Sequence, residues 1–211
     1  LNDKADMNTR RLYHNDGNMK FSDVTEKLGL RASGYNVTCL WLDVDNDGDQ
    51  DLFLANSSGF GAAIDEKYGA NSLYRNNGDG TFTDVSKESG VDIVTNSRGA
   101  TFGDVDNDGD LDIYVTNSRY ESLMFLNDGR GRFTESHEKT GGSVYYGHGC
   151  AFGDLDNDGD LDLTAGNWRR PAASNPGYWK LFENLTNNKN FLKLNIQGTA
   201  SNRSAVMSKV S

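Results

Sequence analysis

Proline is scarce in this chain of 211 residues, which contains 2 prolines but 24 glycines. This balance is typical of many short strands joined by tight turns, and it does not favour a helical protein. Cysteine is also scarce, because only Cys39 and Cys150 are present, and two cysteines are too few to indicate a redox compartment. No apolar run is long enough to cross a bilayer, so we expect no membrane insertion.

The common catalytic motifs are absent as well. The sequence contains no Ser/His/Asp signature, no phosphate-binding loop and no Cys/His zinc spacing. Its three histidines are His14, His137 and His148. We expect His14 and His137 to lie at the surface, and His148 with Arg98 is the one pairing that merits a test for catalysis.

Acidic residues are in excess, with 31 Asp and Glu against 21 Lys and Arg and a net charge of −10. Fifteen of these acidic residues lie in three clusters of five alternating aspartates, so the acidity is local and needs a local explanation. An acidic surface argues against nucleic acid or an anionic membrane as a partner. The clusters read LDVDNDGDQD from Leu42, GDVDNDGDLD from Gly103 and GDLDNDGDLD from Gly153.

The clusters belong to a longer repeat. Their first aspartates, Asp43, Asp104 and Asp154, are 61 and 50 residues apart. Each cluster lies between two short apolar runs, and a hairpin motif with Asn-Gly or Asp-Gly turns alternates with it. The hairpin motif reads LYHNDGNMKF from Leu12, LYRNNGDGTF from Leu73 and MFLNDGRGRF from Met124, with a degenerate copy, LFENLTNNKNF, from Leu181.

One repeat therefore contains four strands, with the acidic loop between the first two and the hairpin turn between the last two. Four-stranded units at this period predict an all-β fold and a β-propeller, in which each unit is one blade. A β-solenoid is the alternative, although its rungs repeat at shorter periods. We expect the first strand of each blade at residues 37–44, 98–105 and 148–155, and the second at 52–55, 113–116 and 161–165.

The sequence opens with a hairpin that has no first and second strand before it. It therefore holds about three and a half blades, whereas closed propellers have about four to eight. We expect either a piece of a longer protein or two copies that together close the ring. The predicted units are a partial blade within 1–36, three blades at 37–90, 91–140 and 141–190, and a further segment at 191–211.

The aspartates occupy positions 1, 3, 5, 7 and 9 of each cluster, and glycine occupies position 6. Alternating oxygens on a curling loop suit Ca²⁺, which takes six to eight oxygen ligands, better than Mg²⁺, which demands a strict octahedron. An EF-hand would need an acidic residue at position 12, where Leu54, Val115 and Ala165 stand instead. A solvated acidic turn is the alternative, but three copies in one register favour metal.

The sequence therefore predicts three structural calcium ions, which would change the net charge from −10 to −4. The aspartate at position 7 of each cluster would bind the ion through its backbone carbonyl, and its side chain would lie outside the set of metal ligands. The predicted ligands are Asp43, Asp45, Asp47, Asp49 and Asp51; Asp104, Asp106, Asp108, Asp110 and Asp112; and Asp154, Asp156, Asp158, Asp160 and Asp162.

The stretches FGDVDNDGDLDIYVTN and FGDLDNDGDLDLTAGN resemble FG-GAP/VCBS-type repeats, the calcium-loop propeller repeats of integrin α-subunits and many secreted bacterial proteins. The resemblance implies a seven-bladed parent propeller, calcium on one face, ligand binding on the other, and a secreted, extracellular or periplasmic location. The first copy departs from the pattern at LWLD and at Gln50. The segment FLKLNIQGTASNRSAV from Phe191 resembles the start of an ASPIC/UnbV domain, which suggests a truncated chain.

Strand direction alternates, so the acidic loops and the hairpin turns share one face of the predicted propeller. The opposite face collects arginines and aromatic residues, a combination that suits an anionic or sugar ligand. The plain alternative is that these are ordinary loop residues. The candidate ligand-binding residues are Arg98, Arg119, Tyr120, Tyr146, His148, Trp168, Arg169 and Arg170.

Three residues on the first strands are expected to be interior. Trp41 stands two residues before the first aspartate, as Phe102 and Phe152 do in the other copies, and we expect it in the core. Cys39 and Cys150 stand four residues before the first aspartate, and we expect buried free thiols there.

Two functions remain open. The sequence favours a calcium-binding extracellular module for adhesion or for binding a carbohydrate, an anionic glycan or a protein. The alternative is the propeller portion of a secreted polysaccharide-active enzyme or oxidoreductase whose catalytic groups lie elsewhere.

Overall fold

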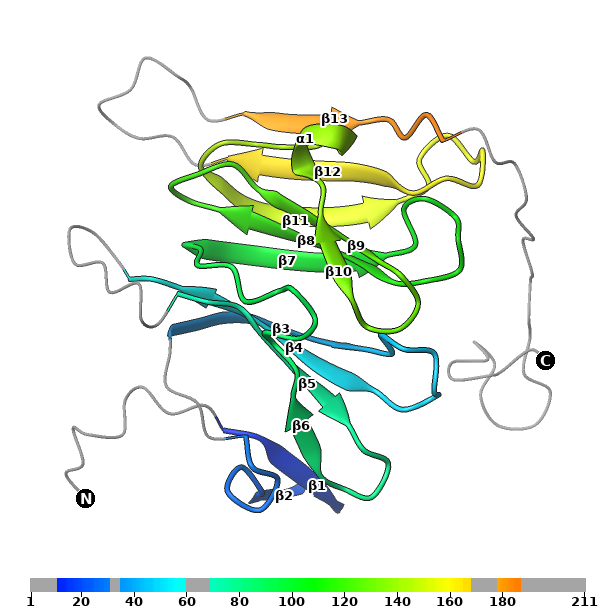
Figure 1. The fold of residues 1–211 in the computed structure, drawn as a ribbon. Coiled ribbons are helices and arrows are strands. Elements are labelled where there is room, and N and C mark those ends of the chain that lie inside the picture. Colours follow the sequence, from blue (N-terminus) through cyan, green and yellow to red (C-terminus); the bar gives the residue numbers. More distant parts are fainter. Residues whose placement is uncertain (1–10, 31–34, 60–68, 168–177, 187–211) are drawn as a thin grey trace.

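The computed structural model describes residues 11–30, 35–59, 69–167 and 178–186 of the chain (Figure 1). This part of the chain is built almost entirely of antiparallel strands, and its single helix, α1 (His137–Thr140), has one turn. None of the described residues forms a helix long and apolar enough to cross a membrane. The predicted all-β fold is therefore confirmed.

The described strands form a stack of antiparallel sheets in chain order, and each sheet is a meander of consecutive strands. A two-stranded hairpin opens the stack, two four-stranded sheets follow, and a sheet with three described strands ends it. The strands are β1 (Tyr13–Gly17) and β2 (Lys20–Asp23); β3 (Tyr35–Leu42), β4 (Asp51–Ser57), β5 (Ser72–Asn76) and β6 (Phe82–Asp84); β7 (Ser97–Gly103), β8 (Asp112–Asn117), β9 (Leu123–Asn127) and β10 (Phe133–Glu135); and β11 (Gly147–Gly153), β12 (Asp162–Asn167) and β13 (Trp179–Phe182).

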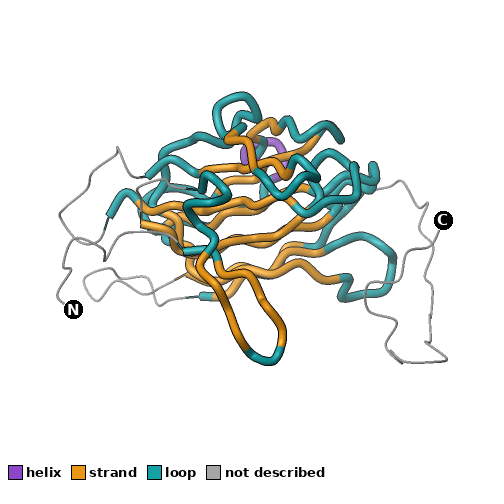
Figure 2. The backbone as a smooth tube through the Cα atoms, turned by 90° about the horizontal axis from the view of Figure 1, so that it is seen from below, coloured by secondary structure: helices purple, strands orange, loops and turns teal. Residues whose placement is uncertain are grey.

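This arrangement is that of a partial β-propeller. The first strands of the three larger sheets lie next to one another, because β7 contacts both β3 and β11. The opening hairpin β1–β2 projects away from the stack when the molecule is viewed from below (Figure 2). How many blades complete the propeller stays a prediction.

The aspartates determine where the strands begin and end. The strand expected at 98–105 is β7 (Ser97–Gly103), which ends before Asp104 because the carboxylate of Asp104 accepts the N–H groups of Asp108 and Gly109 and starts the loop. The strand expected at 161–165 is β12, which begins at Asp162, the last aspartate of its cluster.

The core lies between the sheets. The largest cluster packs β3–β6 against β7–β10 and includes Phe53, Phe125 and Phe133. The next packs β7–β10 against β11–β13 around Tyr114 and Leu163. Because the two four-stranded sheets pack on neighbours through both faces, every residue of β4 and β8 is buried and burial does not alternate.

A polar turn that was not predicted from the sequence follows the opening hairpin and the first four-stranded sheet. The side chain of Asp23 accepts from the N–H and hydroxyl of Thr25, and Asp84 accepts in the same way from Ser86. The hydroxyls of Thr25 and Ser86 in turn accept the N–H groups of Leu12 and Leu73 at the start of the hairpin. Each turn therefore joins the segment that leaves a hairpin to the residue at which the same hairpin begins.

The prediction that Trp41 lies in the core is wrong, because its side chain is 40% exposed. Trp41 pairs with Leu52, on the face of the sheet that meets the opening hairpin. The indole lies 6.1 Å from the ring of Phe82. The equivalent Phe102 is 37% exposed although the preceding sheet has an inner strand, so partial exposure belongs to this position of the first strand. Cys39 is also exposed, and it pairs with Leu54 on the same face as Trp41. Cys150 is a free thiol whose burial raises its pKa to about 12.

Candidate metal centres

Two residues in each aspartate loop have left-handed backbone conformations that let the chain curl around a centre. Position 4 is asparagine, with φ of 60°, 58° and 66° at Asn46, Asn107 and Asn157. Position 6 is glycine, with φ of 92°, 95° and 100° in the three copies. Asparagine tolerates this region and glycine enters it freely, so the sequence DNDG specifies the curl locally. All three loops lie at the right-hand end of the stack in Figure 1.

The first aspartate orders the loop by accepting backbone N–H groups. The carboxylate of Asp43 accepts from Asp47 at 3.1 Å and from Gly48 at 2.9 Å, and Asp104 repeats this in the second loop. In the third loop the N–H of Asp158 is donated to Asp156 instead, at 3.1 Å. The loops are therefore variations on one turn.

The aspartate at position 9 connects each loop to its own blade through hydrogen bonds. Asp51 and Asp112 are fully buried, and Asp162 is 4% exposed. One oxygen of each accepts the N–H of the residue at position 2. The other accepts the N–H of an asparagine, which ends the third strand in the two four-stranded sheets (Asn76, Asn127) and follows β13 in the last (Asn184); these six bonds measure 2.8–2.9 Å. Burial raises the pKa of Asp112 to about 7, although both of these N–H groups favour the carboxylate.

Carboxylate oxygens converge inside each loop. Potential ligand atoms of three aspartates per loop lie within 4.8 Å of one another: Asp43, Asp45 and Asp51; Asp104, Asp106 and Asp108; and Asp154, Asp156 and Asp158. Burial, followed by the charges of Asp47 and Asp43, raises the pKa of Asp45. One buried oxygen, Oδ1, of Asp45 and of Asp154 has no hydrogen-bond partner.

These observations fit a cation. A buried carboxylate oxygen without a donor is costly, and a metal ion would satisfy it and cancel the repulsion among its neighbours. The potential ligands are all oxygens, which suits a hard divalent ion of variable coordination such as Ca²⁺.

The aspartates at position 7 of the second and third loops bond to the preceding loop. The carboxylate of Asp110 accepts from Asn46 of the preceding blade at 2.7 Å, and that of Asp160 accepts from Asn107 at 2.8 Å. In the first loop, the Oδ2 atom of Asp49 lies against Gly78 of the hairpin turn, where a Cβ would come within 2.9 Å of it. Position 4 of one loop is thus bonded to position 7 of the next.

A second bond between blades comes from the asparagine that ends the third strand. The amide of Asn127 donates to the carbonyl of Val44 in the preceding loop at 2.8 Å and to that of Leu111 in its own loop at 3.2 Å. Asn184 repeats both bonds with Val105 and Leu161. This role was not predicted, although the Asn before each turn of the hairpin motif is visible in the sequence.

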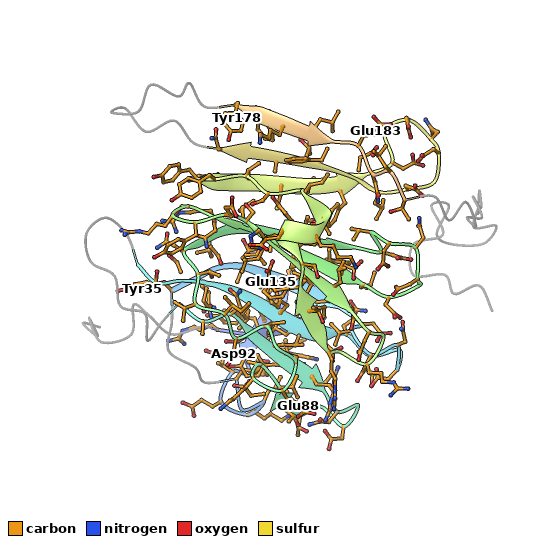
Figure 3. The ribbon with its side chains drawn as sticks, turned by 45° about the horizontal axis from the view of Figure 1, so that its top comes forward. Tyr35, Glu88, Asp92, Glu135, Tyr178 and Glu183 are labelled. Atoms are coloured by element: carbon orange, nitrogen blue, oxygen red, sulfur yellow. The ribbon has the colours of Figure 1, made fainter. Side chains whose placement is uncertain are left out.

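The opposite end of the stack carries the other predicted residues. Arg98, Arg119, Tyr146 and His148 are partly buried there and Tyr120 is exposed, whereas Trp168, Arg169 and Arg170 lie outside the described residues. Tyr35 and Tyr178 mark this end in Figure 3, with Glu183 at the end of the aspartate loops. Burial and the charge of Arg98 lower the pKa of His148, so the structure brings this pair into electrostatic range.

The remaining histidines differ from each other. His14 is exposed as predicted and hydrogen-bonds Asp16. The prediction for His137 is wrong, because its side chain is only 18% exposed and its nitrogens contact Glu135 and Glu121 at 2.8 and 3.0 Å. Burial opposes charging of this ring, but the hydrogen bonds and charges of the two glutamates raise the pKa of His137.

Stacked antiparallel sheets with an aspartate loop between the first two strands of each define a propeller repeat protein. The FG-GAP-like repeat family matches residues 5–54, 43–115 and 104–165, and the chain belongs to this family. The predicted ASPIC/UnbV-like segment at 191–211 lies outside the described residues and stays a prediction.

One relative shares part of the chain. Cartilage acidic protein 1 of Xenopus tropicalis is 34% identical over 86 residues. The match covers 39% of this chain and 13% of that protein, so the chain corresponds to a small part of the relative's length.

The bonds of Asn127 yield a prediction. Asn127→Ala should lower the free energy of unfolding by about 1–3 kcal/mol, because it leaves buried carbonyl groups of two loops without their donor. Asn77→Ala is the matched control, since Asn77 is exposed and its amide donates only within its own turn. Urea unfolding in the presence of calcium measures both, and equal losses would contradict the bridging role.

His137 yields a prediction of pH dependence. A raised pKa in the folded state stabilises the protein below the unfolded value of about 6.5, and this contribution is lost as pH rises through the folded value. His137→Gln should therefore cost about 1 kcal/mol at pH 5.5 and much less at pH 8. Urea unfolding at both pH values tests this, with His14→Gln, at an exposed pair, as the control. A cost independent of pH would refute the charged contact.

Proposed function

We propose that the chain is a calcium-stabilised extracellular module whose aspartate loops hold structural Ca²⁺ and whose opposite face binds a ligand. The observation that carries the calcium role is the convergence of aspartate oxygens in three loops of the same design, two of them with a buried oxygen that no donor satisfies. Positions 1, 3, 5 and 9 supply the carboxylates, and the carbonyl of position 7 completes the set.

The geometry favours a structural role for the ion. Each loop is tied to its own blade through the ninth aspartate and to a neighbouring blade through asparagine, so an ion bound there stiffens the contact between blades. The clusters of potential metal ligands that the described residues form contain aspartate alone, with no histidine or cysteine to alter the chemistry of the ion.

An extracellular location is consistent with such sites. Extracellular calcium modules bind the ion at about 10⁻⁴–10⁻³ M, a concentration at which exposed loops of this kind can be filled. The partial match to a protein named for cartilage supports the same assignment. Adhesion or carbohydrate binding would then use the face away from the loops.

Calcium removal tests the proposal. A ligand that binds only the folded state adds about 2.7 kcal/mol per site at a hundred times its dissociation constant, so a chelator should lower the melting temperature sharply. Native mass spectrometry should show about three ions, as the three loops imply. Asp106→Asn should remove one ion and part of the stabilisation, whereas Asp92→Asn, at an exposed position away from the loops, should remove neither. A melting temperature that does not change with chelator would refute structural calcium.

We further propose that additional blades cover the two ends of the stack. Large apolar side chains are exposed at both ends: Met19 (93%) and Phe21 (63%) on the opening hairpin, and Trp179 (76%) and Leu181 (63%) on β13. Trp179 and Leu181 lie on the face of the last sheet that points away from its packed core, since Phe182 faces that core. Blades of the parent chain, or a second copy, would bury them.

Sedimentation in calcium distinguishes these two sources of blades. If a second copy closes the ring, the chain should dimerise at micromolar concentration, and Trp179→Glu should give monomers because it places a charge in the interface. The matched control is Val94→Glu, at an exposed position in the connection between β6 and β7, away from both ends of the stack. A monomer at every concentration would leave blades of the parent chain as the source.

A further inference from the structure

The three inner strands each carry a β-bulge at the same place. The register shifts between Asn36 and Thr38 in β3, between Ser97 and Gly99 in β7, and between Gly147 and Cys150 in β11. The residues six positions before the first aspartate of each loop lie at these bulges; they are Val37, Arg98 and His148, so the second and third bulges carry the basic side chains. A bulge redirects a side chain, and bulges are common beside functional sites.

The second and third bulges are held side by side. The single hydroxyl of Thr116 lies between the two strands, 2.7 Å from the carbonyl oxygen of His148 and 3.1 Å from that of Gly99, and donates to one or shares its hydrogen between them. The strands are so close here that a Cβ on Gly99 would collide with the carbonyl oxygen of His148. The side chains of Arg98 and His148 therefore start from adjoining points at the end of the stack opposite the aspartate loops.

The loop after β8 adds a second guanidinium group. Asn117 accepts the N–H of Arg119 at 3.1 Å, which holds the start of this loop against the end of the strand. Burial and the charge of Arg119 lower the pKa of Arg98, so the two guanidinium groups lie within electrostatic range of each other. Arg98 donates to the hydroxyl of Ser57 at 3.0 Å and to the carbonyl of Ser97 at 2.9 Å, which fix its direction.

Tyrosines flank this cationic group. The rings of Tyr145 and Tyr146 meet edge to face with their centroids 4.5 Å apart, immediately before β11. Tyr145 is 45% exposed and Tyr120 is 59% exposed. A bridge between Glu121 and Tyr145 brings the segment of Tyr120 next to the tyrosine pair. The end of the stack thus combines two guanidinium groups, an imidazole and exposed phenol rings.

We propose that Arg98, Arg119 and His148 form a binding site for the carboxylate or sulfate group of an acidic polysaccharide. This inference rests on the proposed ligand-binding role of the same face and names the chemistry of the ligand. Guanidinium groups bind planar oxyanions through paired N–H bonds, and tyrosine rings present an apolar face and a polar hydroxyl to a sugar. The tyrosine rings favour a polysaccharide over an acidic peptide, because the acidic side chains of a peptide would contact only the cationic groups.

The protein's overall charge makes the site testable. At a net charge of −10 the chain as a whole repels polyanions, so binding of one requires a local cationic site. The probes are dextran sulfate, carboxymethyl dextran and neutral dextran, which share a backbone and differ in the anionic group, together with poly-glutamate. Binding is measured by calorimetry with calcium present, at low and at physiological salt.

We expect at least one anionic dextran to bind and neutral dextran to bind far less. Arg119→Ala should weaken binding by about tenfold, which corresponds to about 1.4 kcal/mol. His148→Gln is the second variant, because it keeps a polar side chain at the bulge. Arg130→Ala is the matched control, since it makes the same change of charge on an exposed residue in the hairpin turn near the aspartate loops.

Three outcomes would overturn the inference. Equal losses in Arg119→Ala and Arg130→Ala would mean that binding follows net charge. Tighter binding of poly-glutamate than of either anionic dextran would assign the site to an acidic polypeptide. Binding of neutral dextran alone would keep the ligand-binding role and reject the anionic group. Because the calcium dependence of the melting temperature is measured separately on each variant, failure of this site is distinguishable from failure of the calcium-stabilised module.

Discussion

The described fold depends on a buried carboxylate that accepts two backbone N–H groups. The aspartate at position 9 of each loop, Asp51, Asp112 or Asp162, accepts from the start of its loop and from the asparagine that follows the third strand, so one side chain closes the loop and joins it to its own blade. Burying such a group without these donors would be strongly unfavourable. The closed loop also brings its other aspartates close together in a partly desolvated environment, where their negative charges repel strongly, and a bound cation would offset that repulsion.

Much of this architecture could be predicted from the sequence, because several copies of one repeat unit can be compared with one another. Strand order, the acidic loops and the hairpin turns follow from alternation and from Asn-Gly and Asp-Gly chemistry, and these are local properties. The partial exposure of Trp41 and of the equivalent Phe102 could not be predicted, because it depends on how closely the first strands of neighbouring sheets approach each other. His137 was also mispredicted, since its two glutamate partners come from different segments that meet only in the folded chain.

The candidate site was predicted to a similar depth. Spacing alone selected five aspartates in each loop, and the structure brings potential ligand atoms of three of them together in each; Asp112 and Asp162, predicted to close their loops, are not in these sets. The aspartates at position 7 of the second and third loops bond to the preceding loop. Spacing did not identify Asn127 and Asn184, whose amides connect neighbouring loops, because the bond joins residues as many as 83 positions apart. Arg98 and His148 were selected for their charge and place in the strand. The bulges that redirect them are features of strand pairing and leave no clear mark in a single sequence.

The bond from position 4 of one loop to position 7 of the next bears on how such a protein changes over evolutionary time. Each unit carries a forward donor, such as Asn107, and a backward acceptor, such as Asp110. A whole unit can therefore be duplicated, deleted or exchanged without breaking the pairing rule, since its neighbours meet the same two groups as before. A deletion that removes half a unit destroys the pairing on one side. Gene rearrangements that preserve the reading frame of complete units should thus be tolerated, and blade number can vary while the rules of assembly stay constant.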